Sequence, residues 1–344
     1  MFSLPPPHDR ISIAGERRPL LSDATDAQIT TRKSVSSWKP WVSCGLTLIL
    51  VSAAVGFFIK ALIDSGDVHF DWQGALKRSV GGGLSGAAAM VLQVLTLMPL
   101  RTVTNYQYRY GTTTTQAIRT LNADGGLARF YQGMSAALIQ GPLSRFGDTA
   151  ANVGVLALLQ SNPFTREFST LFKTLFASLV AAAFRTFLTP IDTVKTTMQT
   201  EGKAGMPILK NRIKKYGIST LWYGAMATAA AAFVGHYPWF SAYNYLDDNL
   251  PSPHTPLEKL SRRAFIGFMA SICSDPISNF LRVLKTYKQV CETHIGYLDA
   301  ARAVVLADGW RGLLGRGLKT RILTNGLQGL MFSVLWKMFM DMWS

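Results

Sequence analysis

Charged side chains interrupt several apolar segments of this sequence, where they are costly unless they bind or pair with something. Arg145 and Asp148 lie within one such segment, and Arg185 lies within another, five residues before Pro190. Ionisable groups in this setting favour a solute-binding site or ion pairs between helices. Catalysis is not indicated, because the sequence has no HExxH zinc motif, no Walker glycine loop and no Ser-His-Asp arrangement beyond scattered residues. We therefore expect no enzymatic activity, no metal and no cofactor.

The apolar segments that hold these residues are long enough, or nearly so, to cross a membrane. The chain has 344 residues, of which 48% are hydrophobic, and the stretches 41–59, 79–100, 149–165 and 216–246 contain no Asp, Glu, Lys or Arg. A membrane-spanning helix needs about 20 mostly apolar residues. The net charge of +15 comes from basic residues in the connections, which favours membrane orientation over nucleic-acid binding. The three cysteines are isolated, so we expect no disulfides.

Two short motifs recur three times along the chain. The first is a proline that follows an apolar run and precedes a basic stretch, at Pro99, Pro190 and Pro276. The second is a glycine-ended motif, which closes at Gly133, Gly224 and Gly317. Coincident motifs of this kind indicate one supersecondary unit used three times: an apolar helix, a basic connection and a second apolar helix. We predict these repeats at 74–160, 164–247 and 256–342.

The predicted helices of the repeats cover 74–108, 133–160, 166–200, 224–247, 257–289 and 317–342, with short helices at 113–123, 206–215 and 297–307. Residues 41–62 are predicted to form an extra hydrophobic helix that lies outside the repeat. Residues 1–40 are polar, and we expect a disordered tail whose acidic residues do not suit a mitochondrial presequence. Residues 16–21 are similar to an acidic dileucine sorting signal, although such short matches often arise by chance.

The second proline motif carries the strongest resemblance to a known family. Pro190, Asp192 and Lys195, followed by Gln199, match the Pro-x-(Asp/Glu)-x-x-(Lys/Arg) signature of the mitochondrial carrier family. The glycine motifs resemble that family's second signature, and the similarity covers residues 74–342. The resemblance implies an all-α membrane protein, in which a threefold pseudo-symmetric bundle of six helices carries short helices on the matrix side. The N-terminal hydrophobic helix is an addition to that bundle.

The resemblance also implies a matrix-side gate beside the prolines, where charged pairs join neighbouring repeats and break during transport. The residues placed at this gate are Pro99, Arg101, Pro190, Asp192, Lys195, Gln199 and Pro276. The first repeat has Arg101 and Thr104 at the positions of the charged pair, and the third has Ser278 and Leu281. A complete ring of ion pairs is therefore not expected, and Asp192 and Lys195 are expected to pair with Arg101 and other polar neighbours.

In the family, central contact points follow each motif glycine by seven or eight residues, and further polar residues lie one helical turn beyond. The residues predicted to line the substrate cavity are Gln140, Ser144, Arg145, Arg185, His236, Thr324, Asn325 and Gln328. Alternatives remain open: Arg145 and Asp148 are spaced to neutralise each other on one helix, Arg185 is placed to serve the gate, and His236 suits a packing role. If Arg145 and Arg185 both line the cavity, the solute is anionic or zwitterionic.

The family resemblance implies transport of a small solute across the mitochondrial inner membrane, with plastid, peroxisomal and vacuolar membranes as alternatives. It also implies a monomer in contact with membrane lipids, including cardiolipin at the N-termini of the short matrix helices, and no nucleic-acid partner. The incomplete gate keeps a second hypothesis open. In that hypothesis the chain is a non-transporting protein of the same fold, which acts as a structural or interaction subunit of a membrane complex.

Overall fold

The computed structural model describes residues 72–161 and 163–343, and the regular elements within these ranges are all helical. The predicted tail at 1–40 and the predicted hydrophobic helix at 41–62 lie outside the described residues. The long helices are α4 (Trp72–Tyr110), α6 (Met134–Ser161), α8 (Thr170–Phe187), α9 (Thr189–Glu201), α11 (Ala225–Asn249), α12 (Pro256–Val290) and α14 (Leu318–Trp343). The short ones are α5 (Thr114–Phe130), α7 (Pro163–Arg166), α10 (Gly205–Tyr216) and α13 (Tyr297–Gly315), with 3-10 turns at Gly202–Ala204 and Ile218–Trp222.

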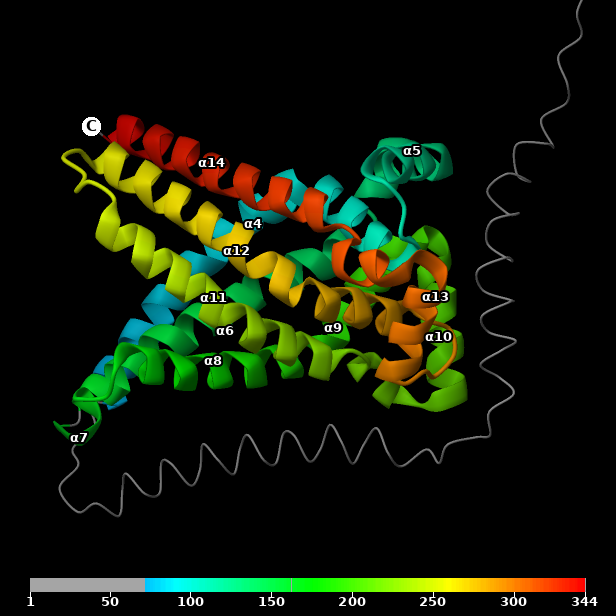
Figure 1. The fold of residues 1–344 in the computed structure, drawn as a ribbon, viewed down its shortest axis with the longest axis horizontal. Helices are drawn as coiled ribbons and strands as arrows, with labels where there is room; N and C mark the ends of the chain where they lie inside the picture. The colour runs from blue at the N-terminus through cyan, green and yellow to red at the C-terminus, as the bar shows by residue number, and fades with distance from the viewer. Residues whose placement is uncertain (1–71, 162, 344) are drawn as a thin grey trace, which may run out of the picture.

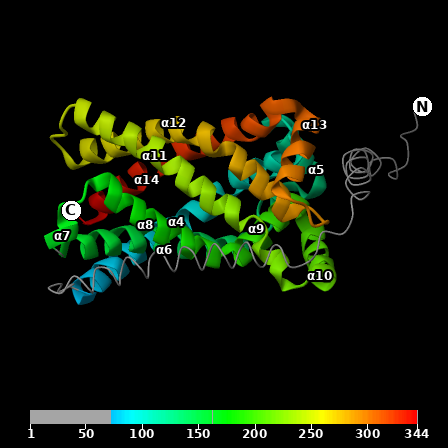
Figure 2. The same cartoon turned by 60° about the horizontal axis from the view of Figure 1, so that its bottom comes forward.

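The long helices close into a ring. Each packs against two neighbours in the order α4, α6, α8, α11, α12 and α14, and α14 returns to α4. The helices α5, α10 and α13 gather at one end of the bundle, whereas α7 and the C-terminus lie at the other (Figures 1 and 2). Three copies of one unit therefore enclose a common axis: α4 to α6 form repeat 1, α8 to α11 form repeat 2, and α12 to α14 form repeat 3. The predicted all-α carrier bundle is confirmed.

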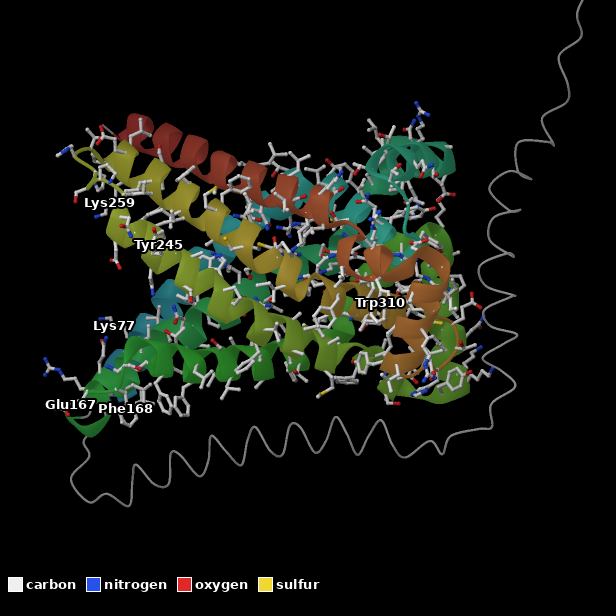
Figure 3. All side chains as sticks on the ribbon, viewed as in Figure 1. Lys77, Glu167, Phe168, Tyr245, Lys259 and Trp310 are labelled. Atoms are coloured by element: carbon white, nitrogen blue, oxygen red, sulfur yellow. The ribbon has the colours of Figure 1, made fainter. Side chains whose placement is uncertain are left out.

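Two helical segments, Ile218–Asn249 and Pro256–Val290, are long and apolar enough to cross a membrane. A third passes the same test if the bent pair Phe172–Phe187 and Thr189–Tyr216 is one span. Charged and aromatic side chains lie at both ends of the bundle: Lys77, Glu167, Phe168, Tyr245 and Lys259 at the α7 end, and Trp310 at the end with the short helices (Figure 3). Such residues favour the two membrane–water interfaces.

The helix predicted at 166–200 is broken, which corrects the prediction of one continuous element. Helix α8 ends at Phe187 and α9 begins at Thr189. The angle between the segments Phe172–Phe187 and Thr189–Tyr216 is 63°. Pro190 lies in the first turn of α9, where its missing N–H leaves no bond unmade. Pro99 and Pro276, by contrast, lie inside the continuous helices α4 and α12. The same proline position therefore has two local outcomes.

The repeated glycines mark the places where neighbouring repeats touch. Gly133, Gly224 and Gly317 each have positive φ (82°, 88° and 65°) and directly precede α6, α11 and α14. A Cβ atom at Gly224 would lie 2.9 Å from the Gln289 side chain of repeat 3, and one at Gly133 would lie 3.0 Å from the Lys195 carbonyl oxygen of repeat 2. Only glycine combines this backbone geometry with so close an approach.

Three buried arginines hold adjacent repeats together at the end with the short helices. Arg129, Arg212 and Arg316 each donate hydrogen bonds to carbonyl oxygens in or just beyond the last turn of a long helix of the next repeat. The accepting oxygens are those of Gln199 and Thr200 in α9, of Gln289 in α12 and Cys291 just after it, and of Tyr108 and Arg109 in α4. The last carbonyls of a helix have no partner within it, so these arginines satisfy them. The result is a threefold ring of inter-repeat contacts.

Candidate functional site

A cavity of about 430 Å³ lies on the axis between the three repeats. Its lining includes every predicted cavity residue except His236, whose side chain lies outside what the structure describes: Gln140, Ser144, Arg145, Arg185, Thr324, Asn325 and Gln328. The predicted gate residues Arg101, Asp192, Lys195 and Gln199 line the same cavity. The structure therefore brings the two predicted sets together in one space, because helices α4, α6, α8, α9, α12 and α14 each turn one polar face inward.

Asp148 on α6 is paired with Arg185 on α8. The guanidinium donates from Nε to Oδ1 at 2.7 Å and from Nη2 to Oδ2 at 2.5 Å, which is a bidentate pair between repeats 1 and 2. The intrahelical pairing of Asp148 with Arg145 is therefore not formed. Arg145 presents an exposed side chain to the cavity and has no acidic partner among the described residues. Its charge is available to a solute.

Asp192 connects all three repeats near the end that carries the short helices. Its carboxylate accepts from Lys195 at 2.7 Å, from Lys285 of repeat 3 at 2.6 Å and from Gln289 at 3.2 Å. Lys195 also donates to Gln140 of repeat 1 at 2.8 Å. We call these residues (Asp192, Lys195, Lys285, Gln289 and Gln140) the Asp192 cluster. No ion pair joins Asp192 to Arg101 among the described residues, whereas the expected contacts with other polar neighbours are formed by Gln289 and Gln140.

Gln199, four residues after Lys195, joins repeat 2 to helix α4 of repeat 1. Its Oε1 accepts from Asn105 of α4 at 2.6 Å, and its Nε2 donates to the Met98 sulfur at 3.3 Å. Gln199 is 1% exposed, so these contacts are shielded from water. An amide that is both a donor and an acceptor suits this position, since it joins α9 to α4 without adding charge.

A third acidic residue, Asp275 on α12, was not predicted to belong to the site. Its Oδ1 lies 2.8 Å from Nε of Arg321 and 3.6 Å from Nη1 of Arg282, and its Oδ2 accepts from Asn325 at 2.5 Å. In the sequence Asp275 directly precedes Pro276, three residues before the expected position of the acid at Ser278. Three residues are about one helical turn, so both positions lie on one face of α12. That spacing was the available signal.

Basic side chains dominate the cavity. Seven basic and two acidic side chains line it: Arg101, Arg145, Arg185, Lys195, Arg282, Lys285 and Arg321, against Asp148 and Asp192. With Asp275 counted as the partner of Arg282 and Arg321, the positive charges exceed the negative ones by four. The apolar part of the lining includes Met90, Met98, Ala231 and Ala232. A cavity of this size and charge suits a small anion, since fixed cations in a low-dielectric setting attract negative charge strongly.

Comparison with known proteins agrees with this architecture. A family model described as mitochondrial carrier protein matches residues 167–253, which hold most of repeat 2. Mitoferrin from Dictyostelium discoideum is 28% identical over 145 residues, which are 40% of this chain and 46% of that protein. The matched part thus spans a little under half the length of the relative. The threefold helical ring, the repeat signatures and these two partial matches together support a place for this chain in the mitochondrial carrier family.

Proposed function

We propose that this chain moves a small anionic or zwitterionic solute across the mitochondrial inner membrane by alternating access. The observation that carries the proposal is the central cavity, whose basic residues exceed the acidic ones and come from all three repeats. The fold supports this reading, because a site on the axis between repeated units is the arrangement that alternating access uses.

The gate in this proposal is the Asp192 cluster. It joins α6, α9 and α12 on the side of the cavity that faces the short helices. Opening toward that side separates Lys285 from Asp192 and Lys195 from Gln140. The Arg185–Asp148 pair joins repeats 1 and 2 at the cavity itself, so its geometry changes with the solute.

Exchange by the purified full-length protein in liposomes tests the proposal. Liposomes are loaded with one unlabelled solute, and uptake of the labelled form is measured for a panel of anionic, zwitterionic, neutral and cationic metabolites. We expect uptake of at least one anion or zwitterion, reduced about tenfold or more in Arg185→Gln, because a hydrogen bond to a charged group contributes about 1.5–3 kcal/mol. Arg302→Gln, on the exposed face of α13, is the matched control. Absence of uptake across the whole panel contradicts the proposal.

One observation favours a second candidate, a carrier-fold subunit of a membrane complex. Arg101 stands where an ion pair is expected in repeat 1, and no acidic side chain lies within 4.0 Å of it among the described residues. A subunit that does not cycle needs no complete gate. Purification from mitochondria in mild detergent separates the candidates: a stoichiometric partner without exchange activity favours the subunit, and a monomer with exchange activity favours the transporter.

A further inference from the structure

Arg101 is a cation in the cavity that lacks an acid. It lies two residues after Pro99 on α4, at the position that Asp192 takes in repeat 2. Within the described part of the chain its guanidinium donates to the Met90 sulfur at 4.0 Å, and a thioether is a weak acceptor. A half-buried guanidinium in a membrane helix is costly without a compensating charge. The charge at this gate position is therefore inverted and unbalanced.

Two further arginines near Arg101 share one carboxylate. Arg282 and Arg321 both approach Oδ1 of Asp275, at 3.6 and 2.8 Å, while Asn325 occupies Oδ2. Arg321 also lies close enough to Arg101 and to Arg282 for the like charges to repel one another. Three arginines thus face one cavity with a single acid between them. We call Arg101, Arg282 and Arg321 the arginine triad.

We propose that the solute is a small organic anion with at least two negative charges on phosphate or carboxylate groups, and that it binds between the three guanidiniums of the arginine triad. The inference rests on the proposed function and names the substrate class of the same cavity. Guanidinium forks match the paired oxygens of phosphate and carboxylate groups, so they favour these groups over halides. Two negative charges offset the excess of the triad over Asp275.

The bound anion also completes the gate. The triad belongs to repeats 1 and 3: Arg101 is on α4, Arg282 on α12 and Arg321 on α14. These three helices all pack against one another. The Asp192 cluster already supplies the acid that joins repeat 2 to repeat 3. Repeat 1 supplies a cation instead, and repeat 3 holds its acid one turn earlier. A multivalent anion between Arg101 and Arg321 makes the missing link, whereas the empty cavity leaves these repeats in mutual repulsion.

Thermal unfolding of the purified full-length protein in detergent tests this inference. The probes are glycerol 3-phosphate, succinate, acetate and glycerol, each at equal ionic strength adjusted with sodium chloride. We expect the two divalent anions to raise the midpoint in a concentration-dependent way, and acetate and glycerol to leave it unchanged. Ligands that bind the folded state alone stabilise it by mass action.

Two substitutions of Arg101 separate binding from folding. Arg101→Gln should bind the divalent anions about 10- to 100-fold more weakly, as expected for loss of a charge-assisted hydrogen bond. Its midpoint without anion should equal or exceed that of the wild type, because an unbalanced charge is removed. Arg101→Glu should raise that midpoint and abolish the response, since it supplies the acid internally. Arg302→Gln should respond as the wild type does.

The outcomes distinguish this inference from the proposed function. If neutral or monovalent solutes shift the wild type as strongly as the divalent anions do, the substrate class is overturned while transport stands. If the divalent anions shift wild type and Arg101→Gln alike, their effect lies elsewhere on the protein and the triad is overturned. If the exchange panel gives no uptake, the proposed function itself falls.

Discussion

Neutralising Asp192 is the sharpest perturbation that the structure offers. The residue is 5% exposed, and its carboxylate holds two lysines at 2.7 and 2.6 Å together with Gln289. Asp192→Asn keeps the shape and leaves two ammonium groups without a counter-charge. Breaking a buried ion pair in this way costs about 3–5 kcal/mol. Because the lysine side chains are 18% and 20% exposed, we expect the lower end, about 3 kcal/mol.

The assay is thermal unfolding of purified full-length variants in one detergent at one scan rate, since unfolding of such proteins is often irreversible. The expected fall in midpoint is on the order of 5–10 °C for a protein of this size. The matched control is Asp247→Asn, whose carboxylate is 46% exposed and pairs with Arg262. Exposed pairs contribute about 0–1 kcal/mol, so its midpoint should change little.

A second substitution tests the cause. Asp192→Asn combined with Lys285→Gln removes one of the two unbalanced ammonium groups, so the double variant should be more stable than the sum of the single changes implies. The reasoning is refuted if Asp192→Asn unfolds at the same temperature as Asp247→Asn, or if the double variant is simply additive.

Three other substitutions have expected outcomes in the same unfolding assay. Gly224→Ala should destabilise the protein more than Gly126→Ala. Both glycines have positive φ, but a Cβ at Gly224 would lie 2.9 Å from a neighbouring side chain, whereas one at Gly126 would meet nothing within 4 Å. Equal falls in the unfolding midpoint would contradict the close-contact explanation. Arg212→Gln should cost roughly 3 kcal/mol through three orphaned carbonyl oxygens, against almost nothing for the exposed control Arg302→Gln. Burial, reinforced by a nearby lysine, lowers the pKa of His294 below its ordinary 6.5, so the unfolded chain takes up protons first and stability should fall as the pH drops below about 6.5. His294→Gln should flatten that part of the profile, and an unchanged profile contradicts the assignment.

The sequence predicted the helical bundle well because its signals are local. Apolar runs with few charged residues located the long helices, and the motif glycines located the starts of α6, α11 and α14. Gly224 illustrates why the motif recurs: its backbone geometry and its contact with the next repeat both exclude a side chain. The break at Leu188 was not predicted, because the proline motif alone does not distinguish a broken helix from a continuous one. Pro99 and Pro276 occupy the same motif position and lie inside continuous helices.

The charged partners were harder to predict because pairing across repeats depends on helix rotation and depth. Lys285 lies on the predicted helix 257–289 but was not assigned to the gate, yet it reaches Asp192. Asp275 stands about one turn from the expected acid position, where a fixed motif spacing does not find it. Arg321 has no motif at all. Its role follows from the contact of α14 with α12, which is a long-range property of the fold.

Accessibility of a single cysteine at Ser144 tests the central claim most directly. Ser144 lines the cavity and is partly buried, so Ser144→Cys places a thiol there with little change in volume. The three native cysteines are first replaced by serine. In sealed proteoliposomes we expect a membrane-impermeant maleimide to label this thiol. Adding the transported solute should change the labelling rate and make the thiol accessible to reagent from the opposite side of the membrane. A thiol that stays unlabelled from both sides, with and without solute, would contradict an aqueous cavity with alternating access.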